Sequence, residues 1–296
     1  MVDVSVIIVN YNGGEWIERA IRAVLNTASG IECEIIVADN GSKDGSAQRI
    51  EDIFGERIRV IRTGENKGFA AGNNAALTYC SGRNILFLNP DTEVRPGAIK
   101  LMSEYLDTHN RVGACGGNLF NDTGKPAFSY WMVLPGLRFE INRLFSDIFL
   151  RLRYHGSEEH NYTKQELKVA HIIGADLMVK RAVLDEVGKM DEDFFLFYEE
   201  TELCYRIQKA GYSIMSIPQA EIIHYEGQTI DKMQLRLPNM MNSRRIYLTK
   251  CCPAKEHMLA DIVLSFSCSI RIMWFSLRRN KQKVKHWQFI KTHIKA

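Results

Sequence analysis

Short apolar runs alternate with amphipathic segments along roughly the first 110 residues. Residues 4–9 form a β-branched run that stops at Asn10, a pattern typical of a buried strand followed by a loop. The next apolar positions recur at helical spacing: Trp16, Ile17, Ala20, Ile21, Val24 and Leu25. Further strands and helices are predicted in the order 35–38, about 45–54, 58–61, about 69–80, 85–88 and about 97–109. This alternation predicts an α/β fold built from right-handed βαβ units, with a mainly parallel, Rossmann-like sheet flanked by helices.

The later part of the chain follows a less regular pattern. Residues 120–168 lack a clear period and scatter aromatic residues among charged ones, so we interpret them as an insertion on the substrate side. Beyond them lie an apolar segment at 172–179, an acidic cluster at 185–202, a short predicted strand at about 213–217 and the apolar pair 222–223 before His224.

The composition is that of an ordinary globular protein. The chain has 296 residues, of which 46% are hydrophobic and 25% charged, with 7 Pro and 21 Gly. These values exclude disordered, collagenous and disulfide-scaffold classes. The seven cysteines are irregularly spaced, and the first residues resemble no signal segment, which predicts reduced thiols in a cytoplasmic protein.

Charge is concentrated at the end of the chain. The formal net charge is +3, yet residues 278–296 contain seven Lys or Arg and no acidic residue. The rest of the chain is therefore slightly acidic, which argues against nucleic acid as a partner. A short basic tail after an apolar segment suits an anionic membrane surface.

Residues 258–277 are long enough to span a bilayer but include Asp261, Arg271 and four serines. On a helical wheel Asp261, Ser265, Ser269 and Ser276 lie on one side, and the other positions are mostly apolar. This pattern favours a helix that lies in the membrane interface, followed by the basic tail. It predicts a peripheral protein on the cytoplasmic face of the inner membrane. The alternative is an ordinary core helix with a frayed basic tail.

Polar loops follow the predicted strands at 10–12, 39–42 and 89–91, where ligands bind in parallel sheets. The dinucleotide and P-loop glycine patterns are absent from the sequence. Asp39 is placed to accept the imide N–H of a uracil or thymine, or else 39–42 is a turn that caps the next helix. Residues 89–91 are either an oxygen-rich site for a divalent cation and a diphosphate or a helix-starting turn. His224 is either a ligand or a structural histidine.

Three carboxylates lie within four residues, at Glu199, Glu200 and Glu202. They follow the apolar run 194–198, and like charges against an apolar wall raise a carboxyl pKa, which suits a general base. Acidic residues in the first turn of a helix also simply favour the helix dipole. The cluster alone leaves both interpretations open.

Four segments in a fixed order resemble glycosyltransferase family 2. They are VSVIIVNYN at 4–12, VADNGSKDGS at 37–46, NKGFAAGNN at 66–74 and FLNPDT at 87–92. Gly174-Ala175, YEETELCYR at 198–206 and His224 also fit the family. The resemblance covers about residues 3–230, and the whole set is most similar to the bacterial rhamnosyltransferase branch.

This resemblance implies a GT-A fold, with a mixed, mainly parallel sheet flanked by helices, and an inverting transfer from a nucleotide-activated sugar. It implies that Asp91 and His224 hold Mg²⁺ or Mn²⁺. Glu200, where the family has a catalytic aspartate, would deprotonate the acceptor hydroxyl, with Glu199 as a second candidate. The implied nucleotide-sugar-binding residues are Asn10, Tyr11, Asn12, Asp39, Asn66, Lys67, Gly68, Asn89 and Asp91.

The function implied by the resemblance is transfer of rhamnose from dTDP-rhamnose to a lipid-linked saccharide or a cell-surface polysaccharide precursor. A UDP-hexose or UDP-hexosamine transferase is the alternative, because Asp39 does not distinguish uracil from thymine. A non-catalytic sugar-nucleotide-binding protein is the alternative from another class. The expected organisation is a GT-A domain at 1–230, with a nucleotide-sugar half (1–115) and an acceptor half (116–230). A helical, basic, membrane-associating region is expected at 231–296, and a homo-oligomer is left open.

Overall fold

A mixed β-sheet forms the centre of the structure, a computed structural model that describes residues 2–226 and 233–294. Its strands are, in spatial order, β3 (Arg59–Arg62), β2 (Cys33–Asp39), β1 (Val4–Asn10), β4 (Asn84–Leu88), β10 (Asp176–Lys180), β6 (Val112–Phe120), β11 (Ser213–His224) and β5 (Thr92–Val94). A ninth strand, β8 (Leu167–Val169), pairs with β11, and β7 (Tyr130–Trp131) pairs with β9 (His171–Ile172) in a separate small sheet. The strands from β3 to β4 are parallel, whereas β10 is antiparallel to both of its neighbours. The predicted α/β class with a mixed sheet is confirmed.

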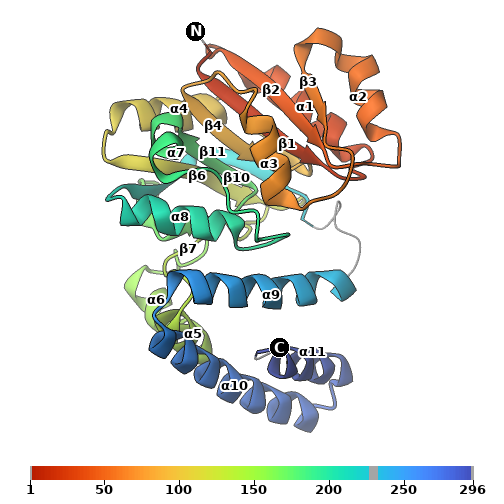
Figure 1. Cartoon of the computed structure of the whole chain (residues 1–296). Coiled ribbons are helices and arrows are strands. Elements are labelled where there is room, and N and C mark those ends of the chain that lie inside the picture. Colours follow the sequence, from red (N-terminus) through yellow and green to blue (C-terminus); the bar gives the residue numbers. More distant parts are fainter. Residues whose placement is uncertain (1, 227–232, 295–296) are drawn as a thin grey trace.

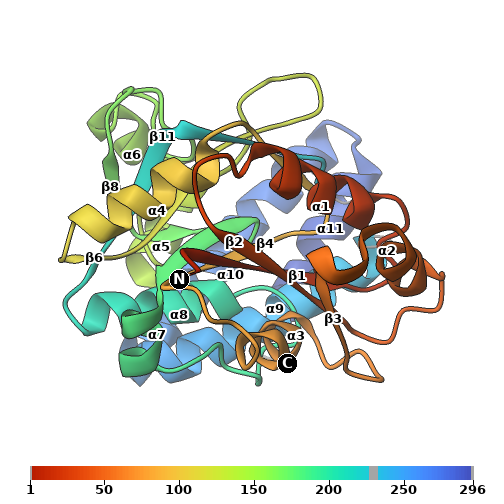
Figure 2. The same cartoon turned by 90° about the horizontal axis from the view of Figure 1, so that it is seen from above.

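Helices cover both faces of this sheet (Figures 1 and 2). One face carries α1 (Trp16–Thr27), α2 (Ser46–Phe54) and α4 (Ala98–Thr108), and the other carries α3 (Phe69–Leu77), α7 (Arg181–Val187) and α8 (Glu199–Lys209). Strand β1 (Val4–Asn10) is apolar on both sides, with Ser5 as the one polar residue before its last position. Val4, Val6 and Ile8 pack in the first core, and Ile7 and Val9 pack in the second. A strand buried on both faces has no polar alternation.

The segment 120–168 is more regular than we expected from the sequence. It contains β7, α5 (Leu137–Leu144), α6 (Ile148–Arg153) and β8. The two helices are too short to show a clear period, and α5 packs against a helix more than 100 residues later in the chain.

Two element boundaries also differ from the prediction. The strand expected at 213–217 and the apolar pair 222–223 belong to one strand, β11, whose register shifts between Ile217 and Glu221. That irregularity breaks the alternation that a sequence pattern depends on. Helix α3 ends at Leu77, earlier than residue 80, and a 3₁₀ turn (Gly55–Arg57) follows α2.

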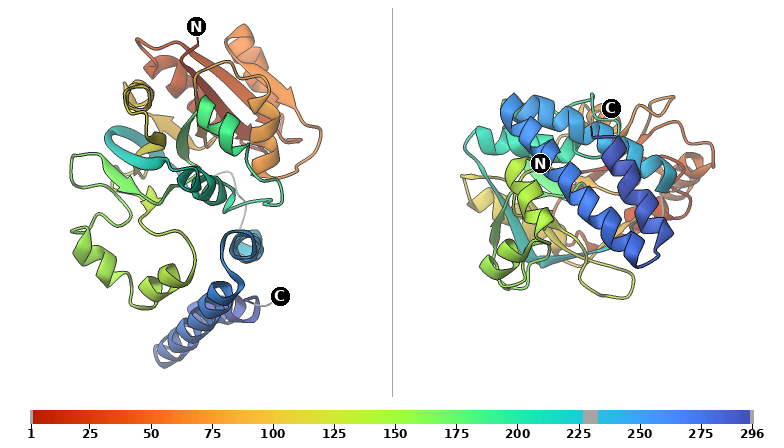
Figure 3. Two further views of the ribbon diagram at one scale, coloured as in Figure 1. Left: turned by 60° about the vertical axis from the view of Figure 1, so that its left-hand side comes forward. Right: turned by 90° about the horizontal axis from the view of Figure 1, so that it is seen from below.

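Three helices lie at the end of the molecule away from the sheet: α9 (Met233–Cys251), α10 (Ala254–Leu277) and α11 (Lys281–Thr292) (Figures 1 and 3). Helix α9 packs through Tyr247 and Leu248 on Phe194 and Tyr198, the residues that lead into α8. The basic tail is not frayed: most of it forms α11, which packs on α10. Helix α10 is long and apolar enough to cross a membrane by length and composition alone. The expected boundary between residues 230 and 231 lies outside the described residues.

Candidate active site

Asn10, at the end of β1, organises the carboxyl ends of the first two strands. Its side-chain amide donates to Asp39 Oδ1 (2.9 Å), to Ser42 Oγ (3.1 Å) and to Ser46 Oγ (2.9 Å). The other carboxylate oxygen, Asp39 Oδ2, accepts the backbone N–H of Ser42 (3.2 Å). The parallel register pairs Asn10 directly with Asp39, which is why the two side chains meet. Asp39 is buried, and these donors fix the direction of its carboxylate.

Asn12 and Tyr11 extend this edge. Asn12 has a left-handed backbone (φ 53°), and its side-chain oxygen accepts the N–H of Lys43 (2.8 Å). The loop after β1 is thus tied to the loop after β2. The side chain of Tyr11 is 43% exposed and is free to contact a ligand.

The Asn66-Lys67-Gly68 loop lies between the loop after β2 and the loop that precedes α8. Asn40 donates to the carbonyl of Gly68 (2.9 Å), and Asn66 Oδ1 accepts the N–H of Gly68 (3.0 Å). Gly68 has φ +97°, and a Cβ there would lie 2.3 Å from the carbonyl oxygen of Phe195. Only glycine allows this close approach of two backbones. Lys67 is exposed and pairs with Glu65 (3.1 Å).

Asn89, Asp91 and His224 meet where β4 ends. The antiparallel pairing of β5 with β11 sets His224 opposite Thr92, one residue after Asp91. His224 Nε2 lies 3.5 Å from Asp91 Oδ1 and 3.5 Å from Asn89 Nδ2. Asp91 Oδ1 is buried and has no hydrogen-bond partner among the described residues. An unsatisfied buried carboxylate oxygen facing an imidazole nitrogen is suited to a cation.

Helix α8 begins with the two candidate bases, Glu199 and Glu200. The residues before it, Phe197 and Tyr198, have left-handed backbones (φ 69° and 72°), a strained geometry that clusters at functional sites. Burial raises the pKa of Glu200, against backbone N–H groups of Glu200, Thr201 and Gly174 that lower it. Burial, and then the Glu200 charge, raise the pKa of Glu199 well above its ordinary range. Glu199 Oε2 is buried without a partner in the described part of the chain.

The start of β10 connects the Asp91 loop to Glu200. Asn89 donates its backbone N–H to the carbonyl of Ala175 (3.1 Å), while the neighbouring Gly174 faces Glu200. A Cβ on Gly174 would lie 3.8 Å from Glu200 Cγ. The Gly174-Ala175 pair therefore separates the candidate base from the candidate metal ligands by a short stretch of backbone.

Sequence reasoning missed His171, which lies on β9 inside an apolar segment. Its Nε2 is 3.9 Å from Glu200 Oε1, and its Nδ1 accepts the backbone N–H of Trp131 (3.3 Å). Burial lowers the pKa of His171 to about 3, so the ring is neutral and carries its hydrogen on Nε2, toward Glu200. A lone polar residue in the run Ala170-His171-Ile172 was the available signal.

Asp176, the first residue of β10, is a second buried group that the sequence pattern did not single out. Burial raises the pKa of Asp176 to about 7, and the charge of His224 opposes that rise. Its Oδ2 accepts the backbone N–H of Gly117. The side chain of Asp176 therefore lies near His224, not near Asn10 and Asp39.

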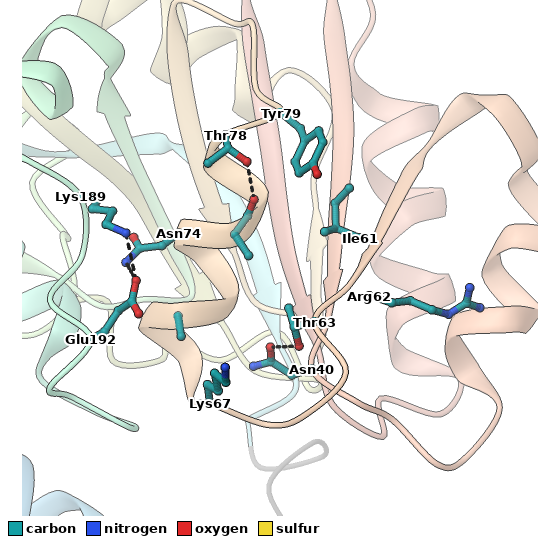
Figure 4. A pocket seen from close by; sticks show the side chains of 12 residues that line it. Asn40, Ile61, Arg62, Thr63, Lys67, Asn74, Thr78, Tyr79, Lys189 and Glu192 are labelled. Atoms are coloured by element: carbon teal, nitrogen blue, oxygen red, sulfur yellow. Dashed lines mark hydrogen bonds and ion pairs between the residues drawn. The ribbon is translucent and has the colours of Figure 1, made fainter.

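A cavity of about 460 Å³ opens beside α3, next to the loop that follows β2 (Figure 4). Asn40, Thr63 and Lys67 line one side of it, and Asn74 and Glu192 line the other. Thr63 donates to Asn40 Oδ1 (3.1 Å), and Asn74 donates to Glu192 (2.8 Å). The cavity borders the predicted nucleotide-binding residues but does not include Glu200 or Asp91.

A family model described as "Glycosyl transferase family 2" matches residues 5–188, and the chain belongs to that family. Its sheet and flanking helices form a GT-A-like fold. GalNAc-T7, solved with UDP, GalNAc and Mn²⁺, superposes with a TM-score of 0.61 at 16% identity, over 83% of this chain and 48% of that chain. TarS of S. aureus superposes with a TM-score of 0.56 at 15% identity, over 90% of this chain and 43% of that chain. This chain thus spans about half the length of these two structures.

Among its relatives are rhamnosyltransferases. The N-acetylglucosaminyl-diphospho-decaprenol L-rhamnosyltransferase of Mycobacterium tuberculosis is 27% identical over 243 residues, 77% of this chain and 78% of the relative. The dTDP-rhamnosyl transferase RfbF of Shigella flexneri is 26% identical, over 83% of this chain and 77% of the relative. A low-salt glycan biosynthesis hexosyltransferase of Haloferax volcanii is 28% identical, over 83% of this chain and 72% of the relative. The protein is a glycosyltransferase similar to rhamnosyltransferases.

Proposed function

We propose that the protein is an inverting, metal-dependent glycosyltransferase that moves rhamnose from dTDP-rhamnose to a lipid-linked saccharide. The names of the mycobacterial and Shigella relatives support the sugar, and the mycobacterial name supports a lipid-diphosphate acceptor. The observation that carries the proposal is the meeting of Asp91 and His224 at the end of β4, separated by Gly174-Ala175 from Glu200.

The nucleotide part of the donor binds at the ends of β1 and β2. Asp39 is held by Asn10 and Ser42, so its carboxylate can accept the imide N–H of the base without reorganising. Tyr11 and Asn12 line the same edge, and Lys67 supplies an exposed positive charge next to Gly68. We propose that Asn66, Lys67 and Gly68 close over the donor on the side of the cavity beside α3.

The side chains of Asp91 and His224 suit a hard divalent cation. Across residues 2–226 and 233–294 no group of three or more His, Cys, Asp or Glu side chains could hold a metal unaided. Asp91 and His224 are the two side chains that would hold Mg²⁺ or Mn²⁺ there, with the remaining positions left to the substrate and water. A cation held there would supply positive charge to offset the charge of the leaving diphosphate. Asn89 Nδ2 lies 3.5 Å from His224 Nε2, and Asn89 precedes Asp91 by two residues.

Glu200 acts as the general base in this proposal. The acceptor hydroxyl oxygen attacks the anomeric carbon, its proton passes to Glu200, and the bond from that carbon to the diphosphate oxygen breaks. A single displacement of this kind inverts the anomeric centre and needs one base. The raised pKa of Glu200 makes its carboxylate a stronger base than an exposed glutamate, and burial with the neighbouring Glu200 charge raises the pKa of Glu199 further above its ordinary range.

A UDP-hexose transferase is the second candidate. The Haloferax relative is named a hexosyltransferase, and the Asp39 contact serves uracil and thymine equally. A panel of nucleotide sugars, assayed for hydrolysis with and without Mn²⁺ and for thermal stabilisation, separates the two. We expect dTDP-rhamnose to be hydrolysed fastest. Preferential hydrolysis of a UDP-sugar would replace the donor assignment, and hydrolysis of no donor would contradict the catalytic proposal.

We also propose that the protein is peripheral on the cytoplasmic face of the inner membrane. Helix α10 and the basic residues after it are the elements that support this location. A lipid-linked acceptor is held at a membrane surface. An enzyme that binds the same surface reaches the acceptor while the acceptor lipid stays in the bilayer.

A further inference from the structure

One face of α10 exposes a continuous row of large apolar side chains. Their exposed fractions range from 40% to 76%, and their spacing of three or four residues keeps them on one side of the helix. The row consists of Met258, Ile262, Phe266, Ile270, Met273, Trp274 and Leu277. Contiguous exposed apolar area of this kind marks a surface that another molecule covers.

Two charged residues of α10, Asp261 and Arg271, bond to other parts of the protein. Asp261 pairs with the buried Arg244 (2.8 Å), which also pairs with Glu140 on α5 (2.9 Å). Arg271 donates to the carbonyl of Arg143 at the end of α5 (2.7 Å). The two charges within 258–277 that count against a membrane helix are therefore both paired with other parts of the protein, and the row of exposed side chains is left apolar.

The short helices α5 and α6 continue this exposed surface. Phe145, Ile148, Phe149 and Leu152 are exposed by 52%, 51%, 56% and 71%. They come from the segment between the substrate-side strands β7 and β8, not from the C-terminal region. Helix α5 packs against α10, and α6 follows α5 at the same end of the molecule (Figure 3).

We infer that α5, α6 and α10 form a single docking face for an anionic lipid bilayer, which rests on the peripheral location proposed above and adds the α5–α6 hairpin to it. The charge at its rim favours lipid over a second copy of the chain. Arg151, Arg153, Arg278 and Arg279 lie next to the exposed apolar residues, and the nearby acids Glu158 and Glu159 pair with arginines. A two-fold dimer would bring these like charges together, whereas anionic headgroups neutralise them.

One helix of this face, α5, also packs toward the proposed catalytic residues. Phe139 on α5 contacts the ring of Trp131 (4.7 Å between centroids), and Trp131 contacts His171 (4.7 Å), which faces Glu200. A short chain of packed rings thus connects the docking face to the candidate base. Helix α5, which supplies part of the docking face, therefore packs toward the side of the site that carries Glu200.

The test uses the full chain and vesicles of phosphatidylcholine with about 30% phosphatidylglycerol. One double variant changes the hairpin (F149E and L152E), and another changes α10 (F266E and M273E). The control pair (Y79E and L101E) replaces side chains that are 47% and 40% exposed near the sheet. We expect each face variant to lose at least about tenfold in vesicle partitioning, because it removes inserted apolar area and adds charge. The control should bind as the unchanged chain does.

Several results would overturn the inference. Unchanged binding by the hairpin variant, with loss only in the α10 variant, would remove α5 and α6 from the face. Equal binding by all variants, or equal binding to vesicles without phosphatidylglycerol, would exclude an anionic lipid surface. A dimer that the face variants convert to monomers, with no change in vesicle binding, would make the face an interface between copies. Thermal unfolding confirms that each variant is folded, and donor hydrolysis in solution tests the catalytic proposal separately.

Discussion

Replacement of Gly68 by alanine tests the close approach between the Asn66-Lys67-Gly68 loop and the loop that leads to Glu200. Gly68 has φ +97° and ψ 174°, a region that is essentially restricted to glycine. A Cβ would lie 2.3 Å from the Phe195 carbonyl oxygen, 2.8 Å from its Cα and 2.9 Å from its carbonyl carbon. These atoms belong to the backbone, so the two loops must separate by about 1 Å to restore ordinary contact.

Two costs add in this variant. The backbone conformation costs about 1–3 kcal/mol, and the forced separation costs about 1–3 kcal/mol more. Because 1 kcal/mol shifts the unfolding midpoint of a chain this large by about 2–4 °C, Gly68→Ala should lower it by at least about 4 °C. The movement also breaks the hydrogen bond from Phe69 N to Phe195 O (2.9 Å). A displacement of about 1 Å near a catalytic base costs on the order of 100-fold in rate.

Gly124 provides the matched control for this experiment. Its φ is +75°, but a Cβ there would have nothing within 4 Å. Gly124→Ala therefore carries only a backbone cost of about 1 kcal/mol, and its rate should stay normal. Thermal unfolding and donor hydrolysis are measured for both variants. Equal midpoints and equal rates for the two would refute the argument from close approach.

Further predictions concern the site chemistry. Glu200→Gln should abolish transfer with donor binding retained, measured by titration with dTDP, and an active Glu200→Gln beside a dead Glu199→Gln would move the base by one residue. Asp91→Asn should lose at least about 100-fold in hydrolysis, and full activity in excess chelator would exclude the metal. The raised pKa of Glu200 predicts that kcat/KM keeps rising with pH above the ordinary glutamate value near 4.5; a rate that levels off by pH 5 would contradict it. The pKa of Glu199 is also raised in the folded protein, so the folded state loses stability as pH rises above the ordinary glutamate value. Glu199→Gln should therefore unfold at a higher temperature than the unchanged chain at pH 8. His171→Phe should move the acid limb of the rate profile to higher pH without changing KM for the donor, because it removes the N–H that favours the Glu200 carboxylate; an unmoved limb would leave His171 a structural residue.

The parallel half of the fold is predictable from sequence because its strands are buried on both faces. Residues such as Val4 and Ile7 belong to one apolar run although they pack in different cores. The polar residues that end such strands, Asn10 and Asp39, then meet because parallel register pairs them. The ends of β1 and β2 could therefore be placed together before the structure was known.

The remaining parts depend on contacts between distant segments. Strand β10 enters the sheet between β4 and β6, and nothing in its apolar sequence specifies that position. His224 reaches Asp91 only through the β5–β11 pairing, and His171 reaches Glu200 through the small β7–β9 sheet. Helices α5 and α6 have too few turns for a periodic signal and depend on Arg244 and α10 for their placement.

The most direct test of the central claim is a transfer assay with a lipid-linked saccharide acceptor, in which mass spectrometry gives the mass of the product and NMR gives its anomeric configuration. The unchanged chain, dTDP-rhamnose and Mn²⁺ should add one deoxyhexose to the acceptor, with inversion at the anomeric carbon. Product should disappear with excess chelator and with Glu200→Gln. Product of retained configuration, or product that persists at the same rate in both controls, would contradict the proposed roles of Asp91, His224 and Glu200.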